Sequence, residues 1–166
     1  FQSIMANPSN NNKIILICSD GGHLAQIMEL KDWFINYDYL IVTEKSPSTL
    51  AYSNQFNIKF LKGRSKGKKR NLSFFLHVFI NFYYTIKILF SHFPKVIITT
   101  GSHTAVPMCV LGKLLRRKVI WILSYARIKS RAASADFIYP IADKFIIQWP
   151  EPQRFYKKAI YLGGIY

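Results

Sequence analysis

The chain has 166 residues, of which 50% are hydrophobic and 16% are aromatic. This length suits one domain with a buried core, and this composition excludes an intrinsically disordered chain. Lysine and arginine total 23 against 8 acidic residues, a formal net charge of +15. Such an excess excludes no fold, but it indicates an anionic partner: a nucleic acid, an anionic membrane or a phosphorylated ligand.

The start of the chain carries no recognisable signal peptide, which predicts a reducing, cytosolic environment. Residues 1 to 4, "FQSI", resemble the remnant of a cleaved tag. We expect residues 1–12 to be tag remnant and flexible tail, and residues 13–166 to be the domain. Its two cysteines, Cys18 and Cys109, are far apart in sequence and form neither a disulfide framework nor a zinc pattern, so we expect no metal and no cofactor.

Seven short runs rich in Ile, Val, Phe and Tyr have the continuous hydrophobicity of strands that are covered on both faces. In chain order they are "KIILICS", "YLIVTE", "IKFLKG", "KVIITTG", "KVIWILS", "KFIIQWP" and "AIYLGG". Segments of helical length and period lie near 23–36, 72–92 and 104–115. This alternation predicts an α/β fold: a single Rossmann-like domain with a mostly parallel sheet of about six or seven strands.

Two glycine-containing loops follow predicted strands, where ligands bind in open parallel sheets. Glycine lets backbone N–H groups approach a ligand, and a following helix N-terminus adds partial positive charge, which suits a phosphate or diphosphate. The alternative is a pair of tight strand-to-helix turns without a ligand. The candidate phosphate-binding residues are Ser19, Gly21, Gly22, His23, Gly101, Ser102, His103 and Thr104.

His23 is the candidate catalytic residue. The positive end of a helix dipole lowers the pKa of an imidazole at its start, and a neutral imidazole accepts a proton from a sugar hydroxyl. The alternative is a capping or hydrogen-bonding histidine, and His103 carries the same ambiguity. No second titratable group is tied to either histidine by its spacing.

A dinucleotide site is a rival interpretation of the first loop. Asp20, Gly22 and Ala25 occupy the three fingerprint positions, and Glu44 stands where the ribose-binding acid belongs. However, the first fingerprint glycine is missing, and the Asp20 carboxylate would lie beside a pyrophosphate. Both departures disfavour an NAD-binding oxidoreductase.

Six cations within residues 62–70 precede an aromatic-rich segment at 72–92. A polar residue every fourth position gives this segment a polar stripe opposite bulky apolar residues, which predicts an amphipathic helix rather than a membrane span. Docking to an anionic membrane is one interpretation, and a helix covering the sheet is the other. A nucleic-acid interface is disfavoured, because no RNP-like pattern or helix-turn-helix signature appears. The candidate membrane-docking residues are Lys68, Lys69, Arg70, Phe75, Phe79 and Phe82.

Three further cations, Arg127, Lys129 and Arg131, follow the predicted strand "KVIWILS". They emerge at the same edge of the sheet as the glycine loops. Cations at this edge can clamp a diphosphate, although a solvated loop explains them equally well.

The segments "CSDGGHLAQIMEL", "TTGSHTAVP", "YARIKS", "YPIADKFIIQWPE" and "YLGGIY" together resemble the PssD/CpsF proteins of bacterial exopolysaccharide and capsule synthesis. These are similar to the membrane-anchoring subunit of the eukaryotic transferase that adds the second GlcNAc to dolichol pyrophosphate. The resemblance covers residues 13–166 and implies the acceptor-side, N-terminal half of a MurG-like GT-B glycosyltransferase.

The resemblance also implies partners and a location. A separate small subunit would carry the UDP-sugar site, the acceptor would be a polyprenyl-pyrophosphate-linked sugar, and this chain would be inactive alone, at the cytoplasmic face of a bacterial membrane. Two residues depart from the family pattern. Asp20 replaces a small hydroxyl residue and would oppose a diphosphate unless a cation from the 127–131 loop offsets it, and Leu123 stands where relatives often carry Glu.

Overall fold

The computed structural model describes residues 12–61 and 72–166, and for residues 72–79 it describes the helix but not the side chains. Residues 1–11 of the tail predicted at 1–12, and the cations of 62–70, therefore lie outside the described residues.

Seven parallel strands form one sheet in the order β3-β2-β1-β4-β5-β6-β7. This confirms the predicted Rossmann-like fold, and each of the seven predicted runs contains a strand. The strands are β1 (Lys13–Ile17), β2 (Asp38–Glu44), β3 (Ile58–Leu61), β4 (Val96–Thr99), β5 (Lys118–Ile122), β6 (Lys144–Ile147) and β7 (Ile160–Tyr161).

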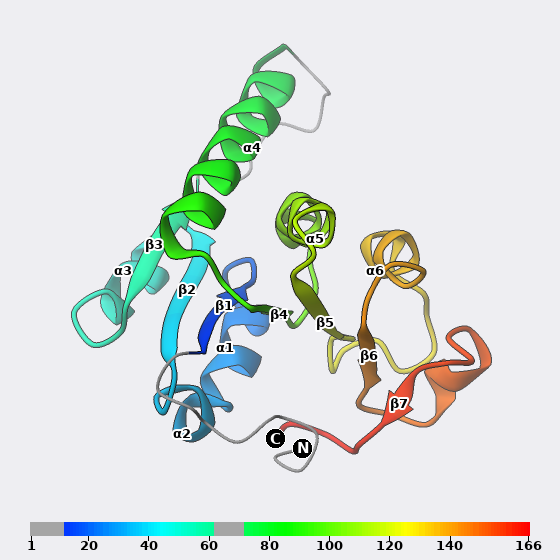
Figure 1. Cartoon of the computed structure of the whole chain (residues 1–166). Helices are drawn as coiled ribbons and strands as arrows, with labels where there is room; N and C mark the ends of the chain where they lie inside the picture. The colour runs from blue at the N-terminus through cyan, green and yellow to red at the C-terminus, as the bar shows by residue number, and fades with distance from the viewer. Residues whose placement is uncertain (1–11, 62–71) are drawn as a thin grey trace.

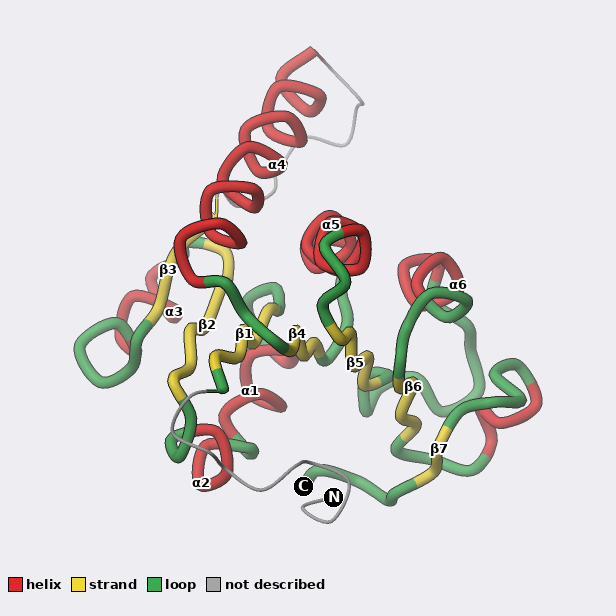
Figure 2. The backbone as a smooth tube through the Cα atoms, in the orientation of Figure 1, coloured by secondary structure: helices red, strands yellow, loops and turns green. Residues whose placement is uncertain are grey.

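Helices cover both faces of the sheet (Figure 1). One face carries α4 (Leu72–His92), α5 (Val106–Leu114) and α6 (Ala133–Ile138), and the other carries α1 (Gly22–Met28) and α2 (Lys31–Phe34). A short helix, α3 (Pro47–Tyr52), follows β2, and the 3-10 turns η2 (His103–Ala105) and η3 (Glu151–Arg154) complete the described elements. Figure 2 shows the same arrangement, with a helix layer on each side of the row of strands.

Alternation along β1 shows how the strands serve two cores. Ile15 and Ile17 pack into the cluster beneath α4, α5 and α6, whereas Ile14 and Leu16 pack into the cluster beneath α1 and α2. All four side chains are buried. A strand that is buried on both faces reads as a continuous apolar run, which is why the strand prediction succeeded.

The helix predictions were less accurate. The single helix expected near 23–36 is two helices, because Leu30 leaves helical geometry (φ −91°, ψ 7°) and inserts its side chain into the core. The six-residue helices α3 and α6 were not predicted, since so short a segment shows no clear helical period.

The helix predicted near 72–92 is α4. Its described part is amphipathic, but a residue of the predicted polar stripe faces the core and several aromatic residues face outward. Thr85, from the predicted polar stripe, is buried and donates its hydroxyl hydrogen to the Asn81 carbonyl (2.8 Å). Ile88 and Leu89 are buried beside it, whereas aromatic residues such as Phe82 are exposed. Within the described ranges, no helix has the length and apolar character needed to cross a bilayer.

We predict that Gly112→Ala destabilises the fold by about 1–2 kcal/mol, although alanine is the better helix former. A β-carbon at Gly112 would overlap Cδ1 of the fully buried Ile97, which β4 presents to α5. Gly22→Ala is the matched control, because a β-carbon there meets no atom within 4 Å. Urea unfolding of both variants measures the difference, and equal stabilities would contradict the packing argument.

Candidate functional site

The predicted glycine loops meet at the point where the strand order reverses. β1 lies between β2 and β4, so the chain moves outward in one direction through β2 and β3, and in the other from β4 onward. Ile17 at the end of β1 is paired in register with Thr99 at the end of β4. The loops that follow these strands therefore start side by side, at the usual ligand position of open α/β sheets.

Two hydrogen bonds join the loops directly. His23 Nδ1 lies 2.9 Å from the Thr100 carbonyl oxygen, and the Thr100 hydroxyl donates to the His23 carbonyl (2.8 Å). Gly101 follows with φ +105°, and a β-carbon there would lie only 3.3 Å from His23 Cε1. Both the backbone angle and the close imidazole therefore require glycine at this position.

The imidazole of His23 is held in one tautomer. A carbonyl oxygen can only accept, so Nδ1 carries the proton and Nε2 is left as the acceptor. Burial lowers the pKa of His23, and the nearby charges of Arg127 and His103 lower it further, while the Thr100 hydrogen bond acts in the opposite direction. The predicted neutral imidazole is therefore supported, although burial rather than a helix dipole is the main cause.

A cleft of about 470 Å³ opens beside these loops. The loops after β1, β4 and β5 and the start of α6 form its walls. Six of the predicted acceptor residues line it: Ser19, His23, Gly101, Ser102, His103 and Arg127. We name it the switch-point cleft. Ser102 has φ 98° and ψ 154°, a backbone conformation that residues other than glycine rarely adopt, and such strain often marks a functional site.

The other four predicted acceptor residues do not line the cleft. Gly21 and Gly22 are exposed, and Thr104 is buried with its hydroxyl donating to the Glu44 carboxylate. Lys129 contributes only its carbonyl, which accepts from Arg154 (2.9 Å). The third cation of that loop, Arg131, is paired with Asp136. Of the three predicted cations, only Arg127 therefore lines the cleft.

The negative charge of the Asp20 carboxylate is stabilised by different groups from those that we expected. It accepts from the Ser48 hydroxyl (2.9 Å) and the Gly21 N–H (2.6 Å), rather than from a cation of the 127–131 loop. Hydrogen bonding from the hydroxyls of Ser46 and Ser48 lowers the pKa of this carboxyl group. Asp20 is therefore anchored to the start of α3 as an ionised residue.

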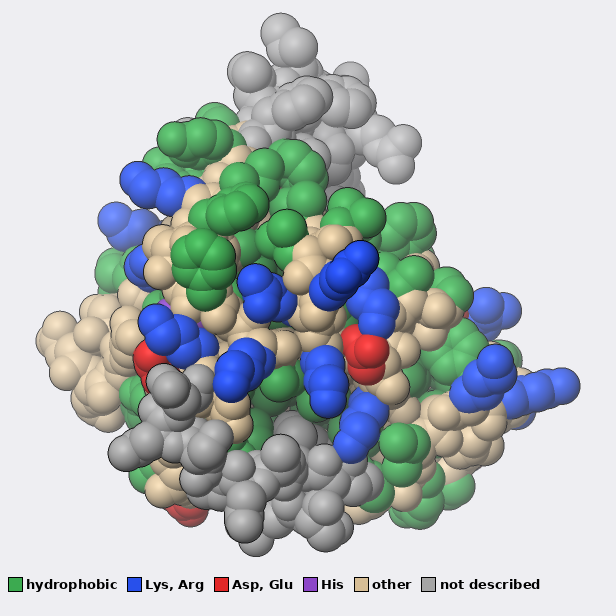
Figure 3. Space-filling view, in the orientation of Figure 1, with side chains coloured by type: hydrophobic (Ala, Val, Ile, Leu, Met, Phe, Trp, Pro, Cys, Tyr) green, Lys and Arg blue, Asp and Glu red, His purple; other side chains and the backbone are tan. Residues whose placement is uncertain are grey.

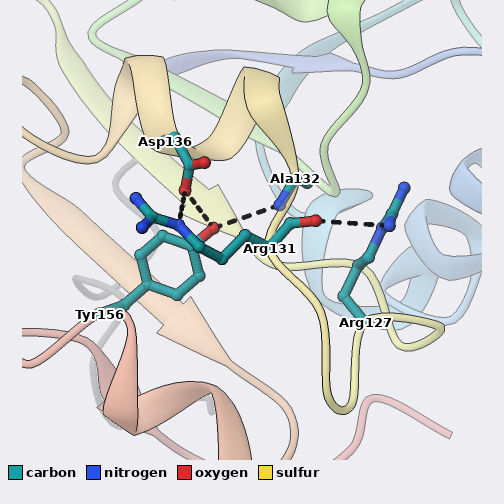
Figure 4. A network of polar contacts seen from close by, with 5 residues as sticks. All are labelled: Arg127, Arg131, Ala132, Asp136 and Tyr156. Atoms are coloured by element: carbon teal, nitrogen blue, oxygen red, sulfur yellow. Dashed lines mark hydrogen bonds and ion pairs between the residues drawn. The ribbon is translucent and has the colours of Figure 1, made fainter.

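A polar network fixes the loop that carries Arg127 (Figure 4). The Asp136 carboxylate accepts from Arg131 Nε (3.1 Å) and from the Tyr156 hydroxyl (2.7 Å). The Tyr156 hydroxyl also lies 3.4 Å from the Ala132 N–H, and the Arg131 carbonyl accepts from Arg127 Nη1 (3.4 Å). Burial, together with the neighbouring carboxylate, raises the pKa of Tyr156 to about 12, so this residue stays a donor.

Sequence reasoning missed two buried amides that support the cleft. Gln26 Oε1 accepts from Gln148 Nε2 (2.8 Å) and from the Tyr125 N–H (3.0 Å), while Gln26 Nε2 donates to the Gly22 carbonyl (3.1 Å). This pair ties the first loop to the ends of β5 and β6. A polar residue on the apolar face of a helix was the available signal.

Trp121 was also missed. Its ring lines the cleft beside Gly101, and its buried Nε1 has no hydrogen-bond partner within the described part of the chain. An unpaired buried donor is costly, so an oxygen-rich ligand that reached it would be favoured. The described ranges contain no cluster of three metal-ligating side chains. The arginine, the neutral imidazole and the serines that line the cleft suit a ligand with anionic oxygens.

The fold and cleft define the class of protein: a domain like the N-terminal half of GT-B glycosyltransferases. MurG of Acinetobacter baumannii superposes with a TM-score of 0.67 at 12% identity, over 84% of this chain and 42% of that chain. The UDP-GlcNAc 2-epimerase of Methanocaldococcus jannaschii gives 0.68 at 13% identity, over 92% and 45%. The chain thus spans less than half of either structure, and likeness at such identities establishes the fold alone.

The chain belongs to the family described as "Oligosaccharide biosynthesis protein Alg14 like", whose model matches residues 14–165. It is 24% identical to the human UDP-N-acetylglucosamine transferase subunit ALG14 over 190 residues, covering 99% of this chain and 88% of that protein. The subunit alg14 of Schizosaccharomyces pombe is 37% identical over 75 residues, which cover 42% of this chain and 36% of that protein. The predicted kinship with that transferase subunit is confirmed, and the PssD/CpsF resemblance stays a prediction.

The lowered pKa of His23 predicts a pH-dependent stability. Because the folded state binds the imidazole proton more weakly than the unfolded state, the free energy of unfolding should fall as pH drops below about 6.5. His23→Asn retains an N–H donor for Thr100 but cannot titrate, so its stability should fall less between pH 7.5 and 5.5. His92 has a lowered pKa for the same main reason and supplies the slope that remains. Equal slopes in the two proteins would refute the assignment.

Proposed function

We propose that this chain is the acceptor-binding, membrane-associated subunit of a two-subunit glycosyltransferase. The enzyme would transfer a sugar, GlcNAc by analogy with the named relatives, from a UDP-sugar to a polyprenyl-pyrophosphate-linked saccharide. The observation that carries the proposal is the switch-point cleft in a chain of the Alg14-like family. A role in bacterial capsule or exopolysaccharide synthesis rests on the PssD/CpsF resemblance alone.

The diphosphate of the acceptor is assigned to the mouth of the cleft beside Arg127. A guanidinium binds phosphate oxygens through charge-assisted hydrogen bonds. Nη1 of Arg127 is engaged with the Ser130 hydroxyl (3.2 Å) and the Arg131 carbonyl, and its remaining N–H groups have no partner among the described residues. The arginine is thus oriented by its own loop and retains donors for a ligand.

His23 is assigned as the proton acceptor for the attacking hydroxyl of the acceptor sugar. The Thr100 carbonyl fixes the imidazole with Nε2 as its acceptor nitrogen, and burial keeps it neutral near pH 7. Both are properties of a general base. The UDP-sugar would come from a separate small catalytic subunit that faces the carboxyl edge of the sheet, as the second half of a GT-B enzyme does.

The dinucleotide alternative has no observation in its favour. Glu44, which would bind a ribose, instead accepts a hydrogen bond from Thr104, and Asp20 remains a carboxylate in the first loop. The membrane association that we propose agrees with the outer side of α4, where Phe82 is 41% exposed. The other predicted docking residues lie outside the described part of the chain: Lys68, Lys69, Arg70 and the side chains of Phe75 and Phe79.

We predict that Arg127→Ala weakens binding of a short-chain polyprenyl-pyrophosphate-GlcNAc by about 10- to 100-fold, the usual effect of losing hydrogen bonds to a charged group. Lys129→Ala, in the same loop but outside the cleft, is the matched control and should bind normally. Isothermal titration calorimetry measures both affinities. Equal losses would indicate general attraction to a basic loop and would remove the diphosphate from this site.

A second prediction concerns turnover. The chain alone should transfer no sugar, and addition of the small UDP-sugar-binding subunit should restore transfer to a lipid-linked monosaccharide. His23→Asn in the reassembled enzyme should lower kcat by about 10²–10⁴-fold with little change in KM, as expected for a lost general base. Full turnover by the isolated chain would refute the division into subunits, and an unchanged kcat would refute the role of His23.

A further inference from the structure

Backbone strain in the described chain is confined to three non-glycine residues with positive φ. One of them, Ser102, lies in the switch-point cleft. The other two, Phe93 (φ 50°) and Arg116 (φ 58°), follow the last residues of α4 and α5. Glycine is the usual residue in this left-handed position after a helix, and a bulky side chain there is unfavourable.

The hydrogen bonds of α5 show why the conformation is required. The Arg116 N–H donates to the Lys113 carbonyl (2.9 Å) and the Arg117 N–H donates to the Gly112 carbonyl (2.8 Å), which closes the helix end in a Schellman motif. Burial does not compensate for the strain, because Arg116 is exposed and the Phe93 side chain is 55% exposed. The fold therefore retains a strained backbone conformation at an exposed phenylalanine and at an exposed arginine.

Both residues lie at the amino edge of the sheet, opposite the switch-point cleft, because α4 and α5 end where β4 and β5 begin. The rings of Phe90 and Phe93 are in edge-to-face contact, and Leu114, at the end of α5, is 74% exposed. Figure 3 shows hydrophobic side chains over α4 and α5 above a row of lysine and arginine side chains. Exposed apolar groups thus border a strongly basic surface.

Five cations of this edge line one groove of about 670 Å³: Lys95, Arg116, Arg117, Lys118 and Lys144. The starts of β4 and β5 bring them together, since the Lys118 N–H donates to the Lys95 carbonyl (3.1 Å). The carboxylate in the groove, Asp143, already binds the Lys113 ammonium (2.6 Å) and the Val119 N–H (2.8 Å). Within residues 12–61 and 72–166, no carboxylate lies at ion-pair distance from Lys95, Arg116, Arg117 or Lys118.

We propose that this amino-edge patch, made of Phe90, Phe93, Leu114, Lys95, Arg116 and Arg117, docks on an anionic lipid bilayer. Cations beside exposed rings match the negative headgroups and the acyl boundary of such a surface. The 21 residues of α4 are roughly 30 Å long, and the helix ends at this edge and extends away from the sheet (Figure 1). The patch rests on the membrane association in the proposed function and extends it beyond the segment predicted from sequence.

The decisive variant is Phe93→Gly, because it separates binding from stability. Glycine relieves the left-handed strain, so the melting temperature should stay the same or rise, while binding of the full chain to vesicles containing phosphatidylserine should weaken by several-fold. Co-sedimentation measures the binding. A variant that is no less stable and binds as well as the parent would overturn the proposal, because the ring would then serve no membrane contact.

Arg116→Ser/Arg117→Ser tests the charge. Each cation removed should weaken binding about fivefold and flatten its dependence on salt. Lys45→Ser/Lys129→Ser removes two exposed cations that follow β2 and β5 at the opposite edge of the sheet; it is the control and should bind normally. Equal losses in the two double variants would show diffuse attraction to net charge and would overturn the patch.

Two further binding assays identify which kind of ligand the amino-edge patch binds. Vesicles of phosphatidylcholine alone should bind weakly, and equal binding to both vesicle types would refute headgroup recognition. Single-stranded RNA should not be bound at the patch; if only RNA binding depends on Arg116 and Arg117, the surface is a nucleic-acid site instead. These assays contain no sugar donor or acceptor, so a failure to bind vesicles would not count against the proposed transferase function. If instead the acceptor did not bind but vesicles did, the chain would be a membrane-docking protein with another function.

Discussion

The two hydrogen bonds exchanged between His23 and Thr100 set the geometry on which the cleft depends. They join two loops that are 77 residues apart in sequence but start on neighbouring strands. The same contact fixes the imidazole tautomer and makes glycine necessary at 101. Because the sheet order reverses between β1 and β4, no helix crosses this point, and the loops remain accessible to a ligand. The positions of the two loops, the tautomer of His23 and the access of a ligand to the cleft therefore follow from one local arrangement.

Charge is distributed by the same topology. In a parallel sheet every strand begins at one edge and ends at the other, so residues at strand starts gather away from residues at strand ends. The groove cations lie at strand starts, whereas Arg127 follows the end of β5. Among the described residues, the cations therefore occupy at least two surfaces, on opposite edges of the domain. Because of this separation, a phosphate, whether soluble or attached to a lipid, can bind at one edge without competition from the cations at the other edge.

Sequence patterns predicted what depends on strand periodicity and on glycine. All seven strands, the parallel sheet and the position of both glycine loops at one edge were predicted, because buried strands and tight turns leave local signals. The roles of Lys129 and Arg131 could not be predicted, since they depend on contacts between side chains and backbone that spacing does not show: the Lys129 carbonyl accepts from Arg154, and Arg131 pairs with Asp136. The Gln26–Gln148 pair joins residues 122 positions apart, and such a contact has no local signal. The left-handed backbone conformations of Phe93 and Arg116 could not be predicted, because glycine is the usual residue in this conformation after a helix and neither position carries glycine.

Leu123 stands where the PssD/CpsF resemblance predicts a glutamate, and this affects which groups in the cleft can accept a proton. Leu123 is buried in the cleft lining, so no carboxylate arises at that position. The Asp20 carboxylate accepts from the Ser48 hydroxyl, and hydrogen bonding from Ser46 and Ser48 lowers its pKa, which makes it a poorer base. The Glu44 carboxylate, at the end of β2, accepts from the Thr104 hydroxyl. Nε2 of His23 is the proton acceptor that we propose, and Arg127 is the proposed diphosphate contact in the same cleft. In the proposed enzyme, proton transfer and acceptor binding both belong to this half, which leaves activation of the donor sugar to the other.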